Sequence, residues 1–351
     1  MSKINYANHY IDEDDINSVI DVLKNEQLTQ GKRVREFEAK IEEYTMYNYA
    51  VAVNSGTAAL HIAGILAGIQ NGDEVIIPSI TFVATANAVK YCNGNPVFCD
   101  VNDCLLIEPL SVTKMITEKT KAIIAVDLGG QQCDYKLLKQ ICNKHNLMLI
   151  IDACHSFGLK PYKDADFVCY SFHPAKHITT GEGGAILCNN SWDSARAMAI
   201  RNHGRWKTFD NQMLDMGYNY RMPDINAALG ISQLNKIDRF LKARKLIAEN
   251  YFKILGNITI SQKYENAWHL YIIVVDERDK FLKYMFDNDI ICQIHYIPVY
   301  EHQYYKKQNI RIDNSYTSTI KDNIVSIPIY PSLSVEDQSK IISLISKYVG
   351  L

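Results

Sequence analysis

The feature that most constrains the fold is an alternation of short apolar runs with helical stretches, which begins at Tyr49. The runs are YAVAVN, DEVIIP, PVFCDV, AIIAVDL, LMLIID, DFVCYSF and GAILCN. Helical patterns occupy residues 60–67, 84–91 and 137–145 between them. Continuous apolar strands that alternate with helices are typical of a mostly parallel sheet covered on both faces. The sequence therefore predicts an α/β fold.

A change of pattern in the second half of the chain indicates a smaller unit. An amphipathic helix is predicted over residues 232–255, and the runs LYIIVVD, KFLKYMFDN, CQIHYIPVY and IVSIPIY follow it. A last helix is expected to begin near Ser334, with acidic residues in its first turn. We therefore predict two domains, 1–240 and 241–351.

Composition excludes several classes of partner. Lys and Arg number 37 and Asp and Glu 39, so a net charge of −2 provides no general attraction to nucleic acid or to an anionic membrane. No apolar run approaches the roughly 18 residues that a membrane span needs, and the first residues lack the apolar core of a signal peptide. The nine cysteines are odd in number and form no CxxC pair, so we expect a reduced, cytoplasmic protein.

The first motif with chemical content is VAVNSGTAALHIAG. A strand ends near Asn54, and a helix opens at Gly56 and Thr57. The free N–H groups of a helix N-terminus bind anions, and glycine lets a phosphate approach the backbone. The motif fits a phosphate cup, with the Thr57 hydroxyl as a further donor, or an ordinary strand–helix turn.

The second motif, LMLIIDACHSFG, places Asp152 at the carboxyl end of a strand. Open α/β sheets bind their ligands at this edge. Asp152 is therefore a candidate ligand-binding carboxylate, and a helix cap or a metal ligand are the alternatives. His155 would stack on a ring or lie on the surface.

The third motif, SFHPAKHITTGEGGAILCN, holds Lys176 in a turn between two strands. A strand ends at Ser171, and Pro174 disfavours a helix around the lysine. Lysine prefers flexible, solvated positions, so this placement is unusual. The spacing of His173 and His177 suits a metal only on a helix and with a third ligand, so we expect no metal site.

Together these motifs fit the requirements of pyridoxal 5′-phosphate (PLP). The cofactor needs a lysine for its covalent attachment, a carboxylate that keeps its pyridine nitrogen protonated, and a phosphate cup. Thr57, Asp152, Ser171 and Lys176 supply these groups in the chain order of the large aminotransferase fold.

A resemblance to the DegT/DnrJ/EryC1/StrS family of sugar aminotransferases is carried by NSGTAAL, PSITFVATANAV, IDACHSFG, SFHPAKHITTGEGG and GYNYRMPDINAALGISQL. The stretches LTQGKRVREFE and QIHYIPVYEHQYYKK resemble the branch that acts on nucleotide-linked 4-keto-6-deoxyhexoses. The resemblance implies a fold-type-I PLP aminotransferase. Its large domain would be built on a seven-stranded, mostly parallel sheet, with a smaller C-terminal α/β domain.

The resemblance also implies roles for individual residues. Lys176 would attach the cofactor and act as catalytic base, and Asp152 would pair with the pyridine nitrogen. The other cofactor contacts would come from the phosphate cup and from two rings that cover the cofactor faces: Gly56, Thr57 and Ser171, with Phe82 and His155. Many relatives have Gln at the position of His155. Phe82 has an alternative as a core residue.

The outer residues are implied to serve the partner subunit and the substrate. Asn219, in GYNYRM, would reach the phosphate of the partner's cofactor, which implies a homodimer with shared active sites. Substrate contacts would come from Gln30, Arg221, His295 and Tyr296. Arg221 has an alternative as a member of a structural ion pair.

The implied reaction transfers an amino group from glutamate to C4 of a nucleotide-linked 4-keto-6-deoxyhexose, with UDP as the expected nucleotide. The product would be a D-gluco 4-amino-4,6-dideoxy sugar or an N-acetylated L-altro sugar. A 3-aminotransferase shares these motifs and remains an alternative. A 3-dehydratase would need His in place of Lys176, and a non-catalytic relative would be expected to have lost Lys176 or Asp152.

Overall fold

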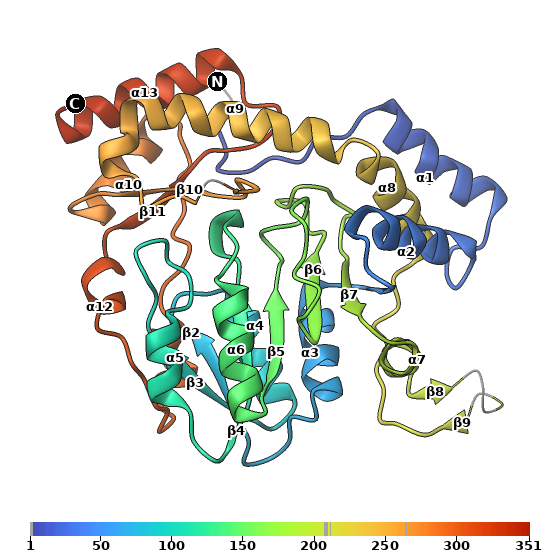
Figure 1. The fold of residues 1–351 in the computed structure, drawn as a ribbon. Coiled ribbons are helices and arrows are strands. Elements are labelled where there is room, and N and C mark those ends of the chain that lie inside the picture. Colours follow the sequence, from blue (N-terminus) through green and yellow to red (C-terminus); the bar gives the residue numbers. More distant parts are fainter. Residues whose placement is uncertain (1–2, 207–209, 211, 264) are drawn as a thin grey trace.

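A seven-stranded sheet forms the centre of the protein (Figure 1). The computed structural model describes residues 3–206, 210, 212–263 and 265–351. In spatial order the strands are β1 (Tyr49–Val53), β7 (Gly184–Cys188), β6 (Phe167–Ser171), β5 (Met148–Asp152), β4 (Thr120–Val126), β2 (Glu74–Pro78) and β3 (Asn95–Cys99). Only β7 runs antiparallel to its neighbours. The predicted mostly parallel α/β sheet is confirmed, and each of the seven apolar runs from Tyr49 to Asn189 overlaps one of its strands.

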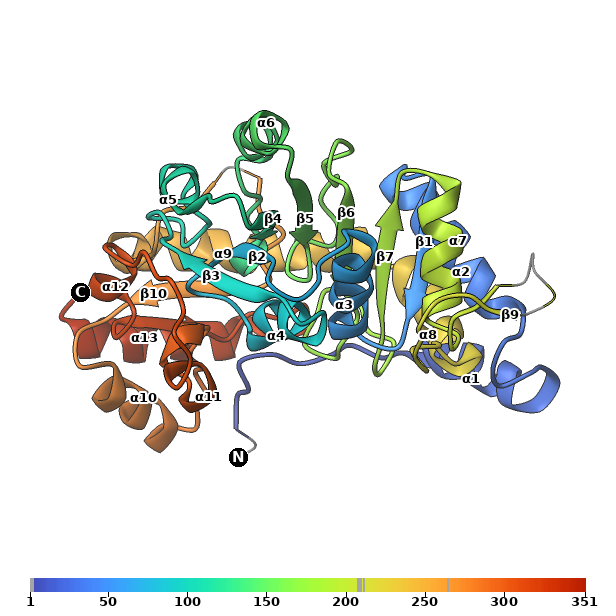
Figure 2. The same ribbon diagram turned by 90° about the horizontal axis from the view of Figure 1, so that it is seen from below.

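Both faces of the sheet are buried, as the continuous apolar runs require. On β5, Leu149 and Ile151 join one hydrophobic cluster, whereas Ile150 joins a second cluster on the opposite face. Burying each of these side chains contributes about 1.5–3 kcal/mol. The second face is covered by α3 (Gly56–Leu66), α4 (Val83–Tyr91) and α7 (Ser191–Ile200) (Figure 2). The first is covered by α2 (Lys32–Thr45), α5 (Pro109–Met115) and α6 (Tyr135–His145).

The long amphipathic segment is divided into two helices, which corrects the prediction of one helix over 232–255. α8 (Asp224–Leu234) ends at Asn235, and α9 (Ile237–Leu255) begins two residues later. Between them, the Lys236 ammonium forms ion pairs with Asp12 and with Asp15 at the start of α1 (Glu13–Asn25). The junction is therefore fixed by contacts across about 220 residues of sequence, which helical periodicity does not detect.

The C-terminal part of the chain has its own small sheet and core. β10 (Tyr271–Val274) pairs antiparallel with β11 (Ile324–Ile327). A third hydrophobic cluster joins this pair to α9, α10 (Arg278–Asp287) and α13 (Val335–Val349). Ser334 caps α13 as expected. This separate core supports a small domain, but the boundary between residues 240 and 241 stays a prediction.

The run CQIHYIPVY forms no named strand, unlike LYIIVVD and IVSIPIY, and all but the last residue of KFLKYMFDN lies in the helix α10. Gln293 makes one bridge to Ser326, and a 3-10 turn (Val299–Glu301) follows Pro298, which has no N–H to donate. The remaining short elements are the hairpin β8 (Arg205–Trp206) and β9 (Gln212–Met213), the helices α11 (Gln303–Lys306) and α12 (Thr317–Ile320), and the 3-10 turns Leu128–Gly130 and Gly256–Ile258. None of the described helices is long and apolar enough to cross a membrane.

Candidate active site

A cavity of about 370 Å³ lies at the carboxyl edge of the sheet. Asp152 is the last residue of β5 and Ser171 the last of β6, and these strands are paired neighbours. Parallel strands present their carboxyl ends at one edge, which is where α/β proteins bind ligands. The cavity brings together nine of the predicted site residues: Gly56, Thr57, Phe82, Asp152, His155, Ser171, Lys176, His295 and Tyr296.

The N-terminus of α3 forms one wall of this cavity. Ser55 caps the helix by accepting a hydrogen bond from the N–H of Ala58. A side chain at Gly56 would approach within 2.8 Å of Ser171 Cβ and 3.1 Å of Cys154 Sγ, so only glycine allows this close packing. Helix N–H groups and the hydroxyls of Thr57 and Ser171 therefore meet at one place, where they suit a phosphate.

Asp152 is a buried carboxylate without a cationic side-chain partner among the described residues. Its Oδ2 accepts a hydrogen bond from Thr85 Oγ1 at 2.8 Å, and Thr85 is in turn bonded to Thr81 at 2.9 Å. Its Oδ1 accepts from the N–H of Cys154 at 3.3 Å, a local turn contact. A buried carboxylate is normally paired with a cation, and a protonated pyridine nitrogen would be one.

Lys176 lies in the turn after β6, with its amine inside the cavity. Burial lowers the pKa of Lys176, and the nearby Cys154 and Asp152 oppose this effect. Its amine Nζ is 3.4 Å from Nε2 of His269. A lysine with a lowered pKa is more readily available as a neutral amine, as a base or nucleophile requires.

Three rings near Lys176 form a connected group. His155 Nδ1 accepts a hydrogen bond from the N–H of Gly129 at 3.3 Å, and its Nε2 is 3.3 Å from the Tyr296 hydroxyl. The rings of His155 and His269 are 4.1 Å apart. Burial holds the pKa of His155 well below its usual value, with the charge of Lys176 as the next cause. His155 is therefore a neutral ring, as stacking on a cofactor requires.

Phe82 is a pocket residue and not a core residue. It is 52% exposed, and its ring lies 5.7 Å from that of Tyr296. The alternative of a core Phe82 is therefore wrong.

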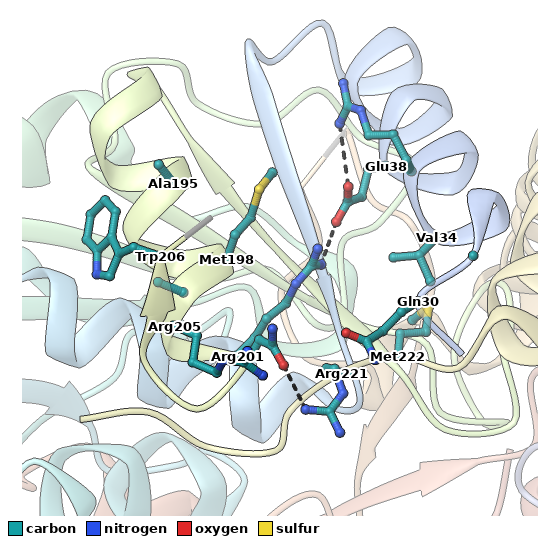
Figure 3. A pocket seen from close by; sticks show the side chains of 14 residues that line it. Gln30, Val34, Glu38, Ala195, Met198, Arg201, Arg205, Trp206, Arg221 and Met222 are labelled. Atoms are coloured by element: carbon teal, nitrogen blue, oxygen red, sulfur yellow. Dashed lines mark hydrogen bonds and ion pairs between the residues drawn. The ribbon is translucent and has the colours of Figure 1, made fainter. Parts of the chain in front are cut away.

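The structure separates three predicted site residues from Lys176. Asn219 and Arg221 line a shallow depression that shares only its Ser55 and Glu182 edge with the Lys176 cavity. Gln30 lines a second cavity of about 380 Å³, together with Arg221. Figure 3 shows that Gln30, Arg201 and Arg221 gather around this second cavity.

The second cavity is basic. Among the described residues that line it are four arginines, one glutamate and Trp206. Arg201 Nη1 donates to Glu38 Oε1 at 2.5 Å, whereas Arg221 Nη1 donates to Asn202 Oδ1 at 2.8 Å. Arg221 has no carboxylate partner in the described part of the chain, so the structural ion-pair alternative gains no support.

The sequence reasoning missed several residues of the main cavity, notably His269 and Tyr6. It also missed Thr85, a buried residue that donates to Asp152. Thr85 stands in the motif PSITFVATANAV, three residues after Phe82, and a helical turn brings it toward Asp152. His269 is 93 residues from Lys176 along the chain and has no local signal. Only the packing of the C-terminal segment onto the sheet edge reveals it.

The residues of the main cavity fit PLP. The glycine cradle and helix N-terminus suit its phosphate, the uncompensated Asp152 suits its protonated ring nitrogen, and Lys176 suits its aldehyde. His155 and Phe82 lie in the same cavity as candidate ring contacts. Each of these residues is the one that the sequence assigns to that requirement, and the roles themselves stay predictions.

Comparisons with known proteins agree with this geometry. The chain is 34% identical over 362 residues to the UDP-4-amino-4,6-dideoxy-N-acetyl-β-L-altrosamine transaminase of Campylobacter jejuni, with 95% of this chain and 94% of that protein covered. PseC of Helicobacter pylori, an aminotransferase involved in pseudoaminic acid biosynthesis, has a similar structure, with a TM-score of 0.92, 29% identity and 99% of both chains covered.

A similar solved structure also supports PLP as the cofactor. The putative sugar aminotransferase Spr1654 of Streptococcus pneumoniae, solved in its PLP form, matches with a TM-score of 0.91 and 26% identity over 98% of both chains. The model of the DegT/DnrJ/EryC1/StrS aminotransferase family matches residues 9–346. The chain, which brings Gly56, Asp152 and Lys176 together in one cavity, therefore belongs to the DegT/DnrJ/EryC1/StrS family of PLP-dependent aminotransferases.

Proposed function

We propose that this enzyme transfers an amino group from glutamate to C4 of a UDP-linked 4-keto-6-deoxyhexose. The observation that carries the aminotransferase part is the meeting of Lys176, Asp152 and the α3 N-terminus in one cavity. The sugar nucleotide and the C4 position are supported by the substrate class of the C. jejuni relative. The product is a 4-amino-4,6-dideoxy sugar of the D-gluco or the N-acetyl-L-altro type.

The proposed chemistry divides between the cofactor and the protein. When bound, PLP supplies an electron sink that makes the C–H bond beside the amino group acidic. Lys176 would move that proton between the amino-bearing carbon and C4′ of the cofactor. It can act as a base because burial favours the neutral form of its free amine. Asp152 holds a proton on the pyridine nitrogen, and Thr85 orients the carboxylate. Gly56, Thr57 and Ser171 bind the phosphate.

The second, basic cavity suits the nucleotide part of the substrate. A cavity of about 380 Å³ falls within the usual range for small ligands. Arginines recognise phosphate by bidentate hydrogen bonds, so the arginines of this cavity suit a diphosphate. Gln30 and Arg221, predicted as substrate contacts, both line it.

A homodimer with shared active sites accounts for the separation of the predicted site into two groups of residues. Asn219, Arg221 and Gln30 lie outside the Lys176 cavity of their own chain, so in this proposal they serve the partner's cavity. Exposed apolar side chains support an association surface: Ile16, Ile20 and Leu23 on α1 are 42%, 37% and 56% exposed. The nine cysteines, all of them in the described part, are free thiols, which supports a cytoplasmic location.

The proposal is tested by product analysis. The PLP-loaded protein is incubated with glutamate and a panel of UDP- and dTDP-linked 4-keto and 3-keto sugars, and the products are identified by mass and NMR. We expect an amine at C4 from a UDP-linked 6-deoxy substrate. Amination at C3 of a 3-keto sugar, with none of the 4-keto substrates turned over, contradicts the proposal.

A further inference from the structure

His269 has no assigned role, although its side chain lies within hydrogen-bond distance of the Lys176 amine. Its Nε2 lies 3.4 Å from Nζ of Lys176, and the residue is only 5% exposed. The sequence motifs that carry the resemblance to the family do not include this histidine. Because His269 lies next to Lys176, the proposed base, its role is sought in an effect on that lysine.

The backbone around His269 is held in place on both sides. The N–H of Ala267 donates to Gly130 at 2.9 Å, and that of Leu270 donates to Gly129 at 3.1 Å. Gly130 has φ +104°, and a Cβ there would lie 2.8 Å from the N of Trp268. The Gly129–Gly130 turn also donates to His155, so one turn positions both rings that face Lys176.

A buried arginine fixes the same segment from the other side. Nη1 of Arg244, on α9, donates to the carbonyl oxygens of Trp268 at 3.1 Å, His269 at 3.4 Å and Ile329 at 2.9 Å. Arg244 is fully buried and has no carboxylate partner among the described residues. It therefore places a positive charge behind His269 and Lys176, which disfavours further positive charge on either group.

The hydrogen-bonding state of His269 follows from its second nitrogen. Nδ1 is buried and has no partner in the described part of the chain. A buried N–H without a partner is rarer in proteins than an acceptor without one. The tautomer with hydrogen on Nε2 is thus favoured, because it leaves only an acceptor unsatisfied. In this tautomer Nε2 donates, and its partner Nζ must accept.

We propose that His269 is a positioning residue for the catalytic lysine: its Nε2–H donates to the lone pair of Lys176 Nζ and holds the released amine neutral and aimed into the cavity. An ammonium group has no lone pair and cannot accept this bond. The proposal rests on the proposed role of Lys176 as the base. It assigns to the neutral amine a hydrogen bond that the ammonium form lacks.

Other groups that face Lys176 also affect its protonation and are kept constant in the test. They are Asp152, Cys154 and His155 at the end of β5, His173 and His177 in its own turn, Glu182, Arg244 on α9, and Tyr6, His295 and Tyr296. Asp152 and Cys154 raise the pKa of Lys176, whereas burial and Arg244 lower it. The proposal adds His269 to the groups that lower it.

The test measures the Lys176 pKa in the cofactor-free protein, where no substrate or turnover is involved. The protein is acetylated with acetic anhydride over a pH series, and labelling of Lys176 is quantified by peptide mass spectrometry against the exposed Lys119. His269→Phe keeps a flat ring but removes the donor. We expect the pKa of Lys176 to rise by about 0.5 to 1 unit, the value of one neutral hydrogen bond. Below the pKa, labelling slows by about 3- to 10-fold.

Three further variants make the result specific. His269→Asn, whose amide ends short of Nζ, carries the same expectation and replaces His269→Phe if that variant does not fold. His269→Gln places an amide donor near the Nε2 position and is expected to keep the wild-type pKa. His61→Phe removes a buried histidine that contacts Tyr220 instead of Lys176, and it is expected to leave the Lys176 pKa unchanged.

An unchanged or lower Lys176 pKa in both His269→Phe and His269→Asn overturns the proposal. A lower value would mean that His269 accepts from the ammonium form. Because labelling requires neither cofactor nor sugar, this result is independent of whether the sugar substrate is correctly identified.

Discussion

The two walls of the main cavity are built in different ways. One wall is the sheet edge, where Asp152 and Ser171 end paired strands and Gly56 opens a helix packed against them. The other wall is irregular chain around His269, His295 and Tyr296, held by single backbone bonds and by the Arg244 side chain in place of a strand ladder. A buried sheet edge resists movement, whereas an irregular wall tolerates change. The sheet-edge wall thus suits binding of the cofactor, which is the same in every reaction cycle. The irregular wall suits the positioning of the base Lys176 and the recognition of the substrate.

The proposed transfer has two half-reactions: glutamate gives its amino group to the cofactor, and the cofactor gives it to the sugar. This comparison predicts that substitutions in the sheet-edge wall abolish both half-reactions. The largest effect is expected for Lys176→Ala, which removes the covalent attachment and the base. The variant should lose the visible absorbance of the bound cofactor and nearly all turnover with glutamate and with sugar. Pyridoxamine phosphate should still bind, because Asp152 and the phosphate cup remain. Normal turnover in this variant would remove Lys176 from the mechanism.

A second substitution in the same wall is Asp152→Asn. The amide cannot hold a proton on the pyridine nitrogen by charge, and a charged hydrogen bond is worth about 1.5–3 kcal/mol. We expect turnover to fall by at least 10²-fold in both half-reactions, with the fold intact by circular dichroism. Asp193→Asn, at the exposed start of α7, is a matched control that should not change turnover. Unchanged kinetics for Asp152→Asn would reduce this carboxylate to a turn residue.

The sheet-edge wall is also the part of the site that sequence reasoning could predict. Lys176, Asp152 and Gly56 each follow from a local pattern, a strand end with an unusual residue after it. His269 and Thr85 were missed because their positions in the site depend on packing between distant segments. An example is the hydrogen bond from the N–H of Ala267 to the carbonyl of Gly130. The break between α8 and α9 was missed for the same reason, since Lys236 pairs with Asp15 far back in the chain.

A smaller effect is expected outside both walls, at Asn219. If the sites are shared, Asn219→Ala leaves the partner's phosphate without one donor and weakens cofactor binding by about 1–3 kcal/mol. The decisive measurement mixes this variant with Lys176→Ala under subunit exchange. One site of the mixed dimer then carries both lesions, and the other is wild type, so activity returns. No recovery, with exchange verified independently, would mean that Asn219 acts within its own chain.

The smallest effect is expected in the irregular wall, at Tyr296. Its hydroxyl contacts His155 Nε2 at 3.3 Å, a long and neutral hydrogen bond worth about 0.5–1.5 kcal/mol. Tyr296→Phe keeps the ring that lies near Phe82, so the shape of the cavity persists. We expect KM for the sugar nucleotide to rise by up to about 10-fold.

The contrast with the sheet-edge variants lies in which half-reaction changes. The glutamate half-reaction of Tyr296→Phe, followed by single-turnover absorbance, should stay within about twofold of wild type, because the wall that holds the cofactor is untouched. An equal loss in both half-reactions would show that the hydroxyl acts through His155 on the cofactor. The two walls would then act as one unit, and this result would contradict the division of cofactor binding and substrate recognition between them.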